Sequence, residues 1–163
     1  AEEGVKRPGR SFSAGKKRGI LRTTNRNLEE SFIMDKIWNE LHEAAMRVIN
    51  PREVSRMIEA GGVAAAIESA SGKIYVGVCV DTACTLGVCA ERNAIFNMIT
   101  NGENAIRRVI AINRDGKAVP PCGACREFMV QLMPDDYRSI EIMMDYKNNK
   151  VVTLGALTPE WWL

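Results

Sequence analysis

The 163-residue sequence has no long apolar run, no low-complexity segment and few aromatic residues. A membrane-spanning helix needs about 18 or more consecutive apolar residues, and no such run is present. The N-terminal segment also lacks the apolar core of a secretory signal peptide, so we expect a cytoplasmic protein. Aromatic residues form only 6% of the chain, which argues against a surface that stacks nucleic-acid bases.

The composition that is present is typical of one globular domain. Apolar residues make up 46% and charged residues 26% of the chain, and a chain of this length can bury a single core. Residues 1–27 carry eight Lys or Arg and two Glu, whereas the rest of the chain is net acidic. We therefore predict a basic tail or added extension over residues 1–27, with Met34 as a plausible native start, and one domain over residues 28–163.

Apolar spacing and turn residues predict the elements of this domain. In chain order they are a helix over 33–49, a hairpin of strands 63–67 and 73–80 introduced by Gly61-Gly62, a helix over 89–100, a strand over 109–112, a helix over 122–133, strands over 140–144 and 151–153, and a short helical cap over 154–163. Because strands alternate with helices, we predict a three-layer α/β/α fold with a mixed sheet of about five strands.

The cysteines are odd in number and lie outside any secretory context, which favours free thiols or metal ligands over disulfides. Cys89 directly precedes one predicted helix, and Cys122 and Cys125 open another. A helix N-terminus stabilises a thiolate, and three protein ligands leave the fourth position of tetrahedral zinc open, as in catalytic sites. A structural site needs a fourth ligand, for which the spacing favours none of the remaining candidates, Cys79, Cys84 and His42.

Glu91 lies in the same helical turn as Cys89, two residues further on. A carboxylate at this position can reach a water molecule at the open zinc position without binding the metal itself. Zinc lowers the pKa of such a water toward about 7, and the resulting nucleophile can attack an amino-substituted ring carbon. We predict that Glu91 carries protons to the ring and to the departing ammonia.

Nucleobase deaminases that use zinc carry a Cys- or His-x-Glu motif followed by Pro-Cys-x-x-Cys. The segments Cys89-Ala90-Glu91-Arg92 and Pro121-Cys122-Gly123-Ala124-Cys125-Arg126, together with Gly77, resemble the cytidine deaminase family in its three-cysteine form. The resemblance implies zinc held by Cys89, Cys122 and Cys125, a proton shuttle at Glu91, and hydrolysis of a free cytosine-type aminopyrimidine to ammonia and a uracil-type product in pyrimidine salvage. It also implies a homo-oligomer, a tetramer or dimer, whose neighbouring subunits complete each site.

Two arginines directly follow the motif residues. Three thiolates leave a zinc site with a net charge of −1, which weakens its Lewis acidity unless cations lie nearby. In three-cysteine members of the family the matching arginines resemble donors to the zinc-bound sulfurs. We therefore predict that Arg92 and Arg126 balance the charge of the site, the alternative for each being a surface ion pair.

The chain departs from the family at the substrate contacts. Nucleoside deaminases carry Asn-x-Glu for the ribose where this chain has Cys79-Val80-Asp81, and Gly61 stands where the family has an aromatic residue. We predict substrate contacts at Cys79, Asp81 and Trp162, the last reaching a neighbouring subunit. Cytidine, deoxycytidine and blasticidin S are candidate substrates; a catalytically silent zinc protein is the alternative function, and a nucleic-acid deaminase is disfavoured by the acidic domain.

Overall fold

The computed structural model describes residues 36–162. One compact unit comprises Ile37–Leu163, and the predicted tail over residues 1–27 lies outside the described residues. A helix whose described part covers residues 36–48 comes first. It is followed by β1 Arg52–Ser55, β2 Ile58–Ser69, β3 Ile74–Thr82, α2 Ala90–Thr100, β4 Ile106–Asn113, α3 Gly123–Leu132, a 3-10 turn Tyr137–Ser139, β5 Glu141–Asp145, β6 Lys150–Thr153 and α4 Leu154–Leu157. Within this part of the chain no helix is long and apolar enough to cross a membrane.

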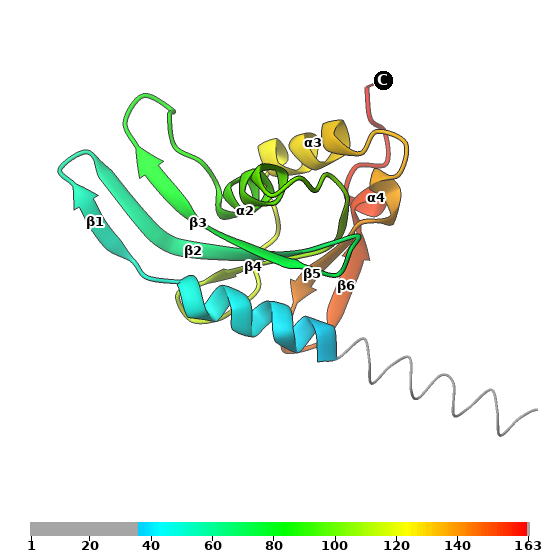
Figure 1. Cartoon of the computed structure of the whole chain (residues 1–163), viewed down its shortest axis with the longest axis horizontal. Helices are drawn as coiled ribbons and strands as arrows, with labels where there is room; N and C mark the ends of the chain where they lie inside the picture. Colours follow the sequence, from blue (N-terminus) through cyan, green and yellow to red (C-terminus); the bar gives the residue numbers. More distant parts are fainter. Residues whose placement is uncertain (1–35, 163) are drawn as a thin grey trace, which may run out of the picture. The chain divides into compact units, whose positions relative to one another are not determined.

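The strands form one mixed sheet around β2 (Figure 1). Antiparallel β3 pairs with β2 from one end to the other, while β1 and β4 pair with successive stretches of its opposite edge. β4 and β5 are parallel, and β6 closes the sheet antiparallel to β5. The sheet has six strands rather than the predicted five. β1 was missed because all four of its residues are exposed, so it has no apolar alternation to reveal it.

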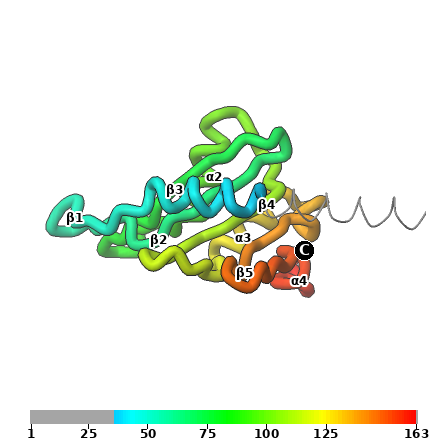
Figure 2. The backbone as a smooth tube through the Cα atoms, turned by 90° about the horizontal axis from the view of Figure 1, so that it is seen from below, coloured from blue at the N-terminus to red at the C-terminus, as the bar shows by residue number. Residues whose placement is uncertain are grey.

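Helices cover both faces of the sheet, which confirms the predicted α/β/α layers (Figure 1). Successive side chains of a strand point to opposite faces. Accordingly Ala64 and Ala66 of β2 pack in the core beneath residues 36–48, whereas Ala65 and Ile67 pack in the core shared with α2 and α3. Figure 2 shows the first helix lying across the near face of the sheet. The fully buried helix residue Leu41 joins the first core.

The prediction that Gly61-Gly62 precedes a strand is wrong, because both glycines lie inside β2. The pairing of β2 with β3 is irregular between Ala60 and Ala64, as expected of a β-bulge. Gly61 has φ +82°, and a Cβ there would lie 2.0 Å from the carbonyl oxygen of Asn50. Glycine is therefore needed at Gly61 for the bulge rather than for a turn.

Helix α2 is fixed closely against the outer strand β3. A Cβ on Gly77 would lie 2.3 Å from the backbone nitrogen of Ala94, so only glycine allows this approach. The carboxamides of Asn93 and Asn97 donate hydrogen bonds to the strand carbonyls of Val78 and Val76, at 2.9 and 3.2 Å. These bonds give partners to two carbonyls on the outer edge of β3 and hold α2 against the strand.

Candidate active site

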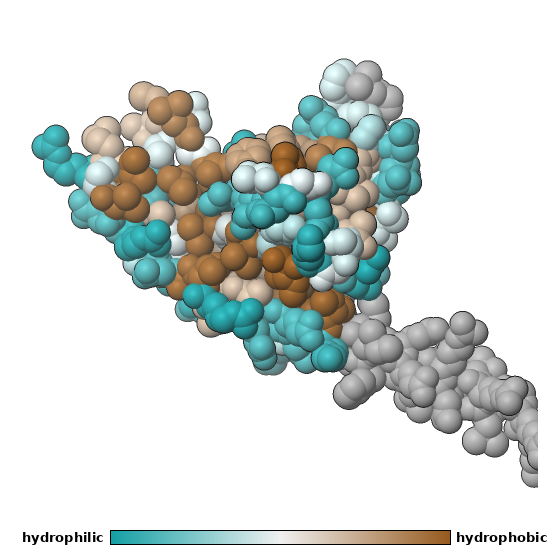
Figure 3. All heavy atoms as spheres, in the orientation of Figure 1, coloured by the Kyte–Doolittle hydropathy of each residue, from teal (hydrophilic) through white to brown (hydrophobic). Residues whose placement is uncertain are grey.

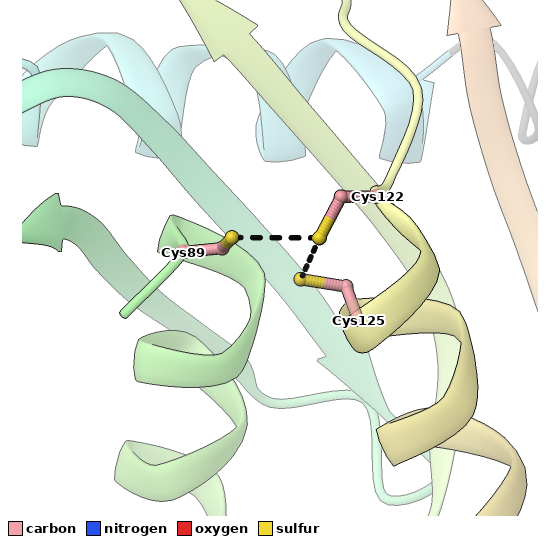
Figure 4. Close-up of side chains that lie close together, drawn as sticks. All are labelled: Cys89, Cys122 and Cys125. Carbon is pink, nitrogen blue, oxygen red and sulfur yellow. Dashed lines mark hydrogen bonds between the residues drawn. The ribbon is translucent and has the colours of Figure 1, made fainter. Parts of the chain in front are cut away.

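Three cysteine sulfurs converge where the N-termini of α2 and α3 meet (Figure 4). Cys89 is the N-cap of α2 and Cys122 the N-cap of α3, both with extended backbones, and Cys125 lies in the first turn of α3. The Cys122 sulfur lies 3.5 Å from each of the other two. The fold thus brings Cys89 and Cys122, which are 33 residues apart in the sequence, into one cluster.

The cluster fits a tetrahedral zinc ion. Zinc–sulfur bonds of about 2.3 Å place the sulfurs of a tetrahedral site about 3.8 Å apart, and all three sulfurs lie within 4.8 Å of one another. Among residues 36–162, Cys89, Cys122 and Cys125 are the complete group of side chains placed to hold a metal ion. A set of three sulfurs leaves one coordination position for water or substrate, as in catalytic zinc sites.

The alternative fourth ligands are not members of the sulfur cluster. The Nε2 atom of His42 is hydrogen-bonded to the carbonyl of Gly116 at 2.9 Å, and Cys84 is exposed. Cys79 is buried, and its sulfur accepts a hydrogen bond from the backbone N–H of Val63 at 3.3 Å. The open-site interpretation is therefore the one that this geometry supports.

The sulfur cluster needs a cation before all its members can be thiolates. Burial raises the pKa of Cys89 and Cys125. Burial acts in the same direction at Cys122, but hydrogen bonds from the backbone N–H of Cys125 and from Cys89 outweigh it and lower that pKa. Because like charges at this separation disfavour joint ionisation, a bound metal ion is the natural counter-charge for the three sulfurs.

Glu91 lies in the first turn of α2 and is only 5% exposed. Burial raises the pKa of its carboxyl group, and contacts with its own backbone N–H and with the Cys125 thiol only partly offset this effect. Glu91 lines the same cavity as Cys89 and Cys122. Its carboxyl group is thus beside the sulfur cluster and open to a molecule in the cavity.

The two predicted charge-balancing arginines are placed differently. Burial acts to lower the pKa of Arg92, but hydrogen bonding and the charges of Cys89 and Cys125 outweigh it and raise that pKa. The Nε atom of Arg92 is buried without a partner in the described structure. Arg126 instead donates from Nε to the Pro121 carbonyl at 3.0 Å and from Nη1 to the Leu157 carbonyl at 3.4 Å. Its observed contacts brace the segment before Cys122 and do not involve sulfur.

A cavity of about 640 Å³ opens beside the sulfurs, between the end of β3, the start of α2 and the segment leading to α3. Its walls include the predicted Cys79, Asp81, Cys89, Glu91, Arg92 and Cys122. Sequence reasoning missed further wall residues, among them Val63, Thr85, Arg114, Val119 and Pro120. They carry no common motif and come from separate segments, so no sequence signal unites them.

The predicted substrate contacts divide into two groups. Cys79 and Asp81 both line the cavity, and the Cys79 thiol lies 3.5 Å from the Asp81 carboxylate. Trp162 is 71% exposed, and its indole N–H donates to Glu127 rather than facing this cavity. Its predicted contact concerned a neighbouring subunit and stays a prediction.

Comparison with known proteins agrees with the geometry of the site. The model of the cytidine and deoxycytidylate deaminase zinc-binding region matches residues 39–138. A cytidine deaminase from Halalkalibacterium halodurans is 35% identical over 45% of this chain and 57% of its own length. A blasticidin-S deaminase from Bacillus cereus is 32% identical over 60% of this chain and 74% of its own. The chain spans about half the length of the curated cytidine deaminases it matches.

Comparison of the fold with solved structures also finds cytidine deaminases. The crystal structure of cytidine deaminase from Mycobacterium leprae superposes with a TM-score of 0.62 at 25% identity, covering 76% of this chain and 98% of that one. The family model extends over more than half of the chain and includes all three clustered cysteines. The chain belongs to the cytidine and deoxycytidylate deaminase family.

Proposed function

We propose that the protein is a zinc-dependent aminohydrolase that converts a free cytosine-type aminopyrimidine and water into the uracil-type product and ammonia. The observation that carries this proposal is that Cys89 and Cys122, which form one sulfur cluster with Cys125, line the same cavity as the buried residue Glu91. This combination supplies metal ligands, a proton carrier and a space for a small molecule. The volume of the cavity suits a small-molecule substrate.

Cys89, Cys122 and Cys125 would hold the zinc ion. When bound, the ion supplies the Lewis acidity that makes a water molecule nucleophilic near neutral pH. Arg92 would offset the excess negative charge of the three thiolates, a role supported by the raised pKa of its guanidinium, to which Cys89 and Cys125 contribute. Because the site requires three reduced cysteines, the proposed function places the protein in a reducing compartment such as the cytoplasm.

Glu91 would move the protons of the reaction. Its carboxylate accepts one proton from the attacking water and delivers it to the ring nitrogen next to the reacting carbon. As the carbon–nitrogen bond to the amino group breaks, the second proton of the water passes through Glu91 to the departing nitrogen, which leaves as ammonia. The water oxygen remains on the ring as the new carbonyl, so atoms and charges balance.

Measuring ammonia release from candidate substrates tests this function directly. Zinc-loaded protein should release ammonia from at least one of cytidine, deoxycytidine, cytosine and blasticidin S, measured by a coupled ammonia assay and by the absorbance of the uracil-type product. Blasticidin S is included for two reasons: one relative is a blasticidin-S deaminase, and Cys79-Val80-Asp81 stands in place of the ribose motif. Binding of these compounds without ammonia release would instead support a catalytically silent zinc protein.

We also propose that the protein forms a homo-oligomer. Large apolar side chains are exposed at Val54 in β1, at Met57 in the turn after β1 and at Leu86 in the loop after β3, and apolar residues gather at these ends of the unit (Figure 3). Exposed apolar patches of this kind are typical of protein interfaces. Light scattering coupled to size exclusion should give the mass of a dimer or tetramer; the mass of a single chain at micromolar concentration would contradict the proposal.

A further inference from the structure

Arg114 is a cavity residue that the proposed reaction does not use. It lines the same cavity as Cys89, Cys122 and Glu91. Within residues 36–162 its guanidinium has no hydrogen bond or ion pair with a protein group. A guanidinium offers several N–H donors in a rigid fork. The donors of Arg114 are therefore available to a molecule bound in the cavity.

The turn that carries Arg114 is held by its own hydrogen bonds. The side-chain oxygen of Asn113 accepts hydrogen bonds from the backbone N–H groups of Asp115 and Lys117, both at 3.0 Å. The backbone N–H of Asn113 also donates to the carbonyl of Lys117 at 3.0 Å. The position of the Arg114 backbone is consequently determined by a closed turn at the end of β4.

The first helix supports this turn from the other side of the sheet. His42 is hydrogen-bonded to the carbonyl of Gly116 at 2.9 Å. The His42 ring is stacked on Tyr146 with centroids 3.9 Å apart, and the Tyr146 hydroxyl donates to Asn39 at 2.7 Å. This chain of contacts fixes the turn relative to the sheet, so that Arg114 is presented to the cavity from a stable support.

The charges of the cavity give Arg114 a distinct position. Arg92 also lines the cavity, but it lies in the first turn of α2, at the end of the helix where the three sulfurs meet. The other charged side chains of the wall are Asp81, Glu91 and Arg114, and three thiolates leave a bound zinc ion with a net charge of −1. Asp81, Glu91 and the zinc site would therefore repel an anionic group in the cavity, whereas Arg114 would attract it.

We propose that Arg114 binds an anionic group, a phosphate monoester or a carboxylate, on the substituent of the aminopyrimidine. Guanidinium pairs with both groups through two parallel hydrogen bonds. Arg114 thereby selects charged over neutral members of the substrate class. The proposal rests on the proposed deaminase function, whose aminopyrimidine it narrows to those with an anionic substituent.

The test compares kcat/KM for cytidine, cytidine 5′-monophosphate and cytidine 5′-uronic acid in zinc-loaded wild type and Arg114→Ala. Loss of a charged hydrogen bond of about 1.5–3 kcal/mol should lower kcat/KM for the anionic compounds by about 10- to 150-fold and leave cytidine nearly unchanged. A loss confined to the monophosphate identifies phosphate as the group, and a loss confined to the uronic acid identifies carboxylate. Equal effects on all three compounds, or none, would overturn the proposal.

Lys117→Ala is the matched control, because Lys117 is an exposed cation of the same turn that does not line this cavity. It should preserve the preference for the anionic compounds. Arg114→Lys should restore part of that preference, because lysine keeps the charge but lacks the fork. If Lys117→Ala lowered the preference for anionic compounds as much as Arg114→Ala, the positive charge of the whole turn would explain that preference. This result would contradict a specific role of Arg114.

A binding measurement separates this proposal from the deaminase proposal. Calorimetry of the zinc-loaded protein should show tighter binding of uridine 5′-monophosphate than of uridine, with the difference lost in Arg114→Ala. If this holds but no compound releases ammonia, the deaminase function fails and anion recognition by Arg114 stands. If ammonia is released but Arg114→Ala leaves selectivity and binding unchanged, only the role of Arg114 fails.

Discussion

Replacing Glu91 with glutamine should lower the rate of ammonia release by about 10²- to 10⁴-fold, the usual contribution of a general acid–base group, while zinc stays bound. Glutamine has nearly the same shape but cannot accept and return a proton. Glu91 is buried beside Cys125 and lines the cavity, so solvent cannot easily replace it as a proton carrier. The rate is measured by ammonia assay under saturating substrate, and zinc by elemental analysis of the same sample.

Glu43→Gln is a suitable control for Glu91→Gln, because Glu43 is an exposed residue of the first helix on the opposite face of the sheet. It should keep the wild-type rate. Thermal unfolding of both variants separates loss of chemistry from loss of fold. A Glu91→Gln protein that is folded, zinc-loaded and as fast as wild type would show that another group carries the protons.

Replacing Cys122 with serine should reduce bound zinc from one ion per chain to a small fraction after dialysis. Cys122 is central to the cluster, with its sulfur 3.5 Å from both Cys89 and Cys125. A serine hydroxyl does not ionise near neutral pH and is a poor zinc ligand. Because changing a group that merely supports a ligand already weakens metal binding by about 10- to 100-fold, loss of a ligand should cost more. Metal content and the midpoint of thermal unfolding should both fall.

Cys84→Ser provides the comparison for Cys122→Ser. Cys84 is an exposed cysteine outside the sulfur cluster, so this variant should retain one zinc ion per chain and the wild-type unfolding temperature. Equal zinc content in Cys122→Ser and wild type would refute the three-sulfur site. Zinc loss in Cys84→Ser would place a ligand in the loop after β3.

The fold illustrates where sequence patterns succeed and where they fail. The helix starts at Cys89 and Cys122 and the hairpin before α2 were predicted because periodicity and turn residues are local signals. β1 was missed because its exposed residues carry no such pattern. Gly61-Gly62 was misplaced because a glycine pair indicates a turn and a bulge equally well.

The sequence by itself determined which chemically active residue types stand close together along the chain. A thiol at a helix start, a carboxylate two residues further on in the same turn and a Cys-x-x-Cys pair are properties of neighbouring residues, and they pointed to Cys89, Glu91, Cys122 and Cys125 without any fold. Local geometry fixes the short Cys122–Cys125 separation, since both residues lie in one helical turn.

Only the tertiary structure decided which of the other residues face these groups. Gly77 allows α2 to pack closely on β3, and this contact brings Cys89 to the start of α3. The same packing places Arg92 and Arg114 on the cavity wall and brings Arg126 to the backbone carbonyls of Pro121 and Leu157. The physical reason is that distances between segments far apart in the sequence are set by strand pairing and close packing, which no local pattern encodes.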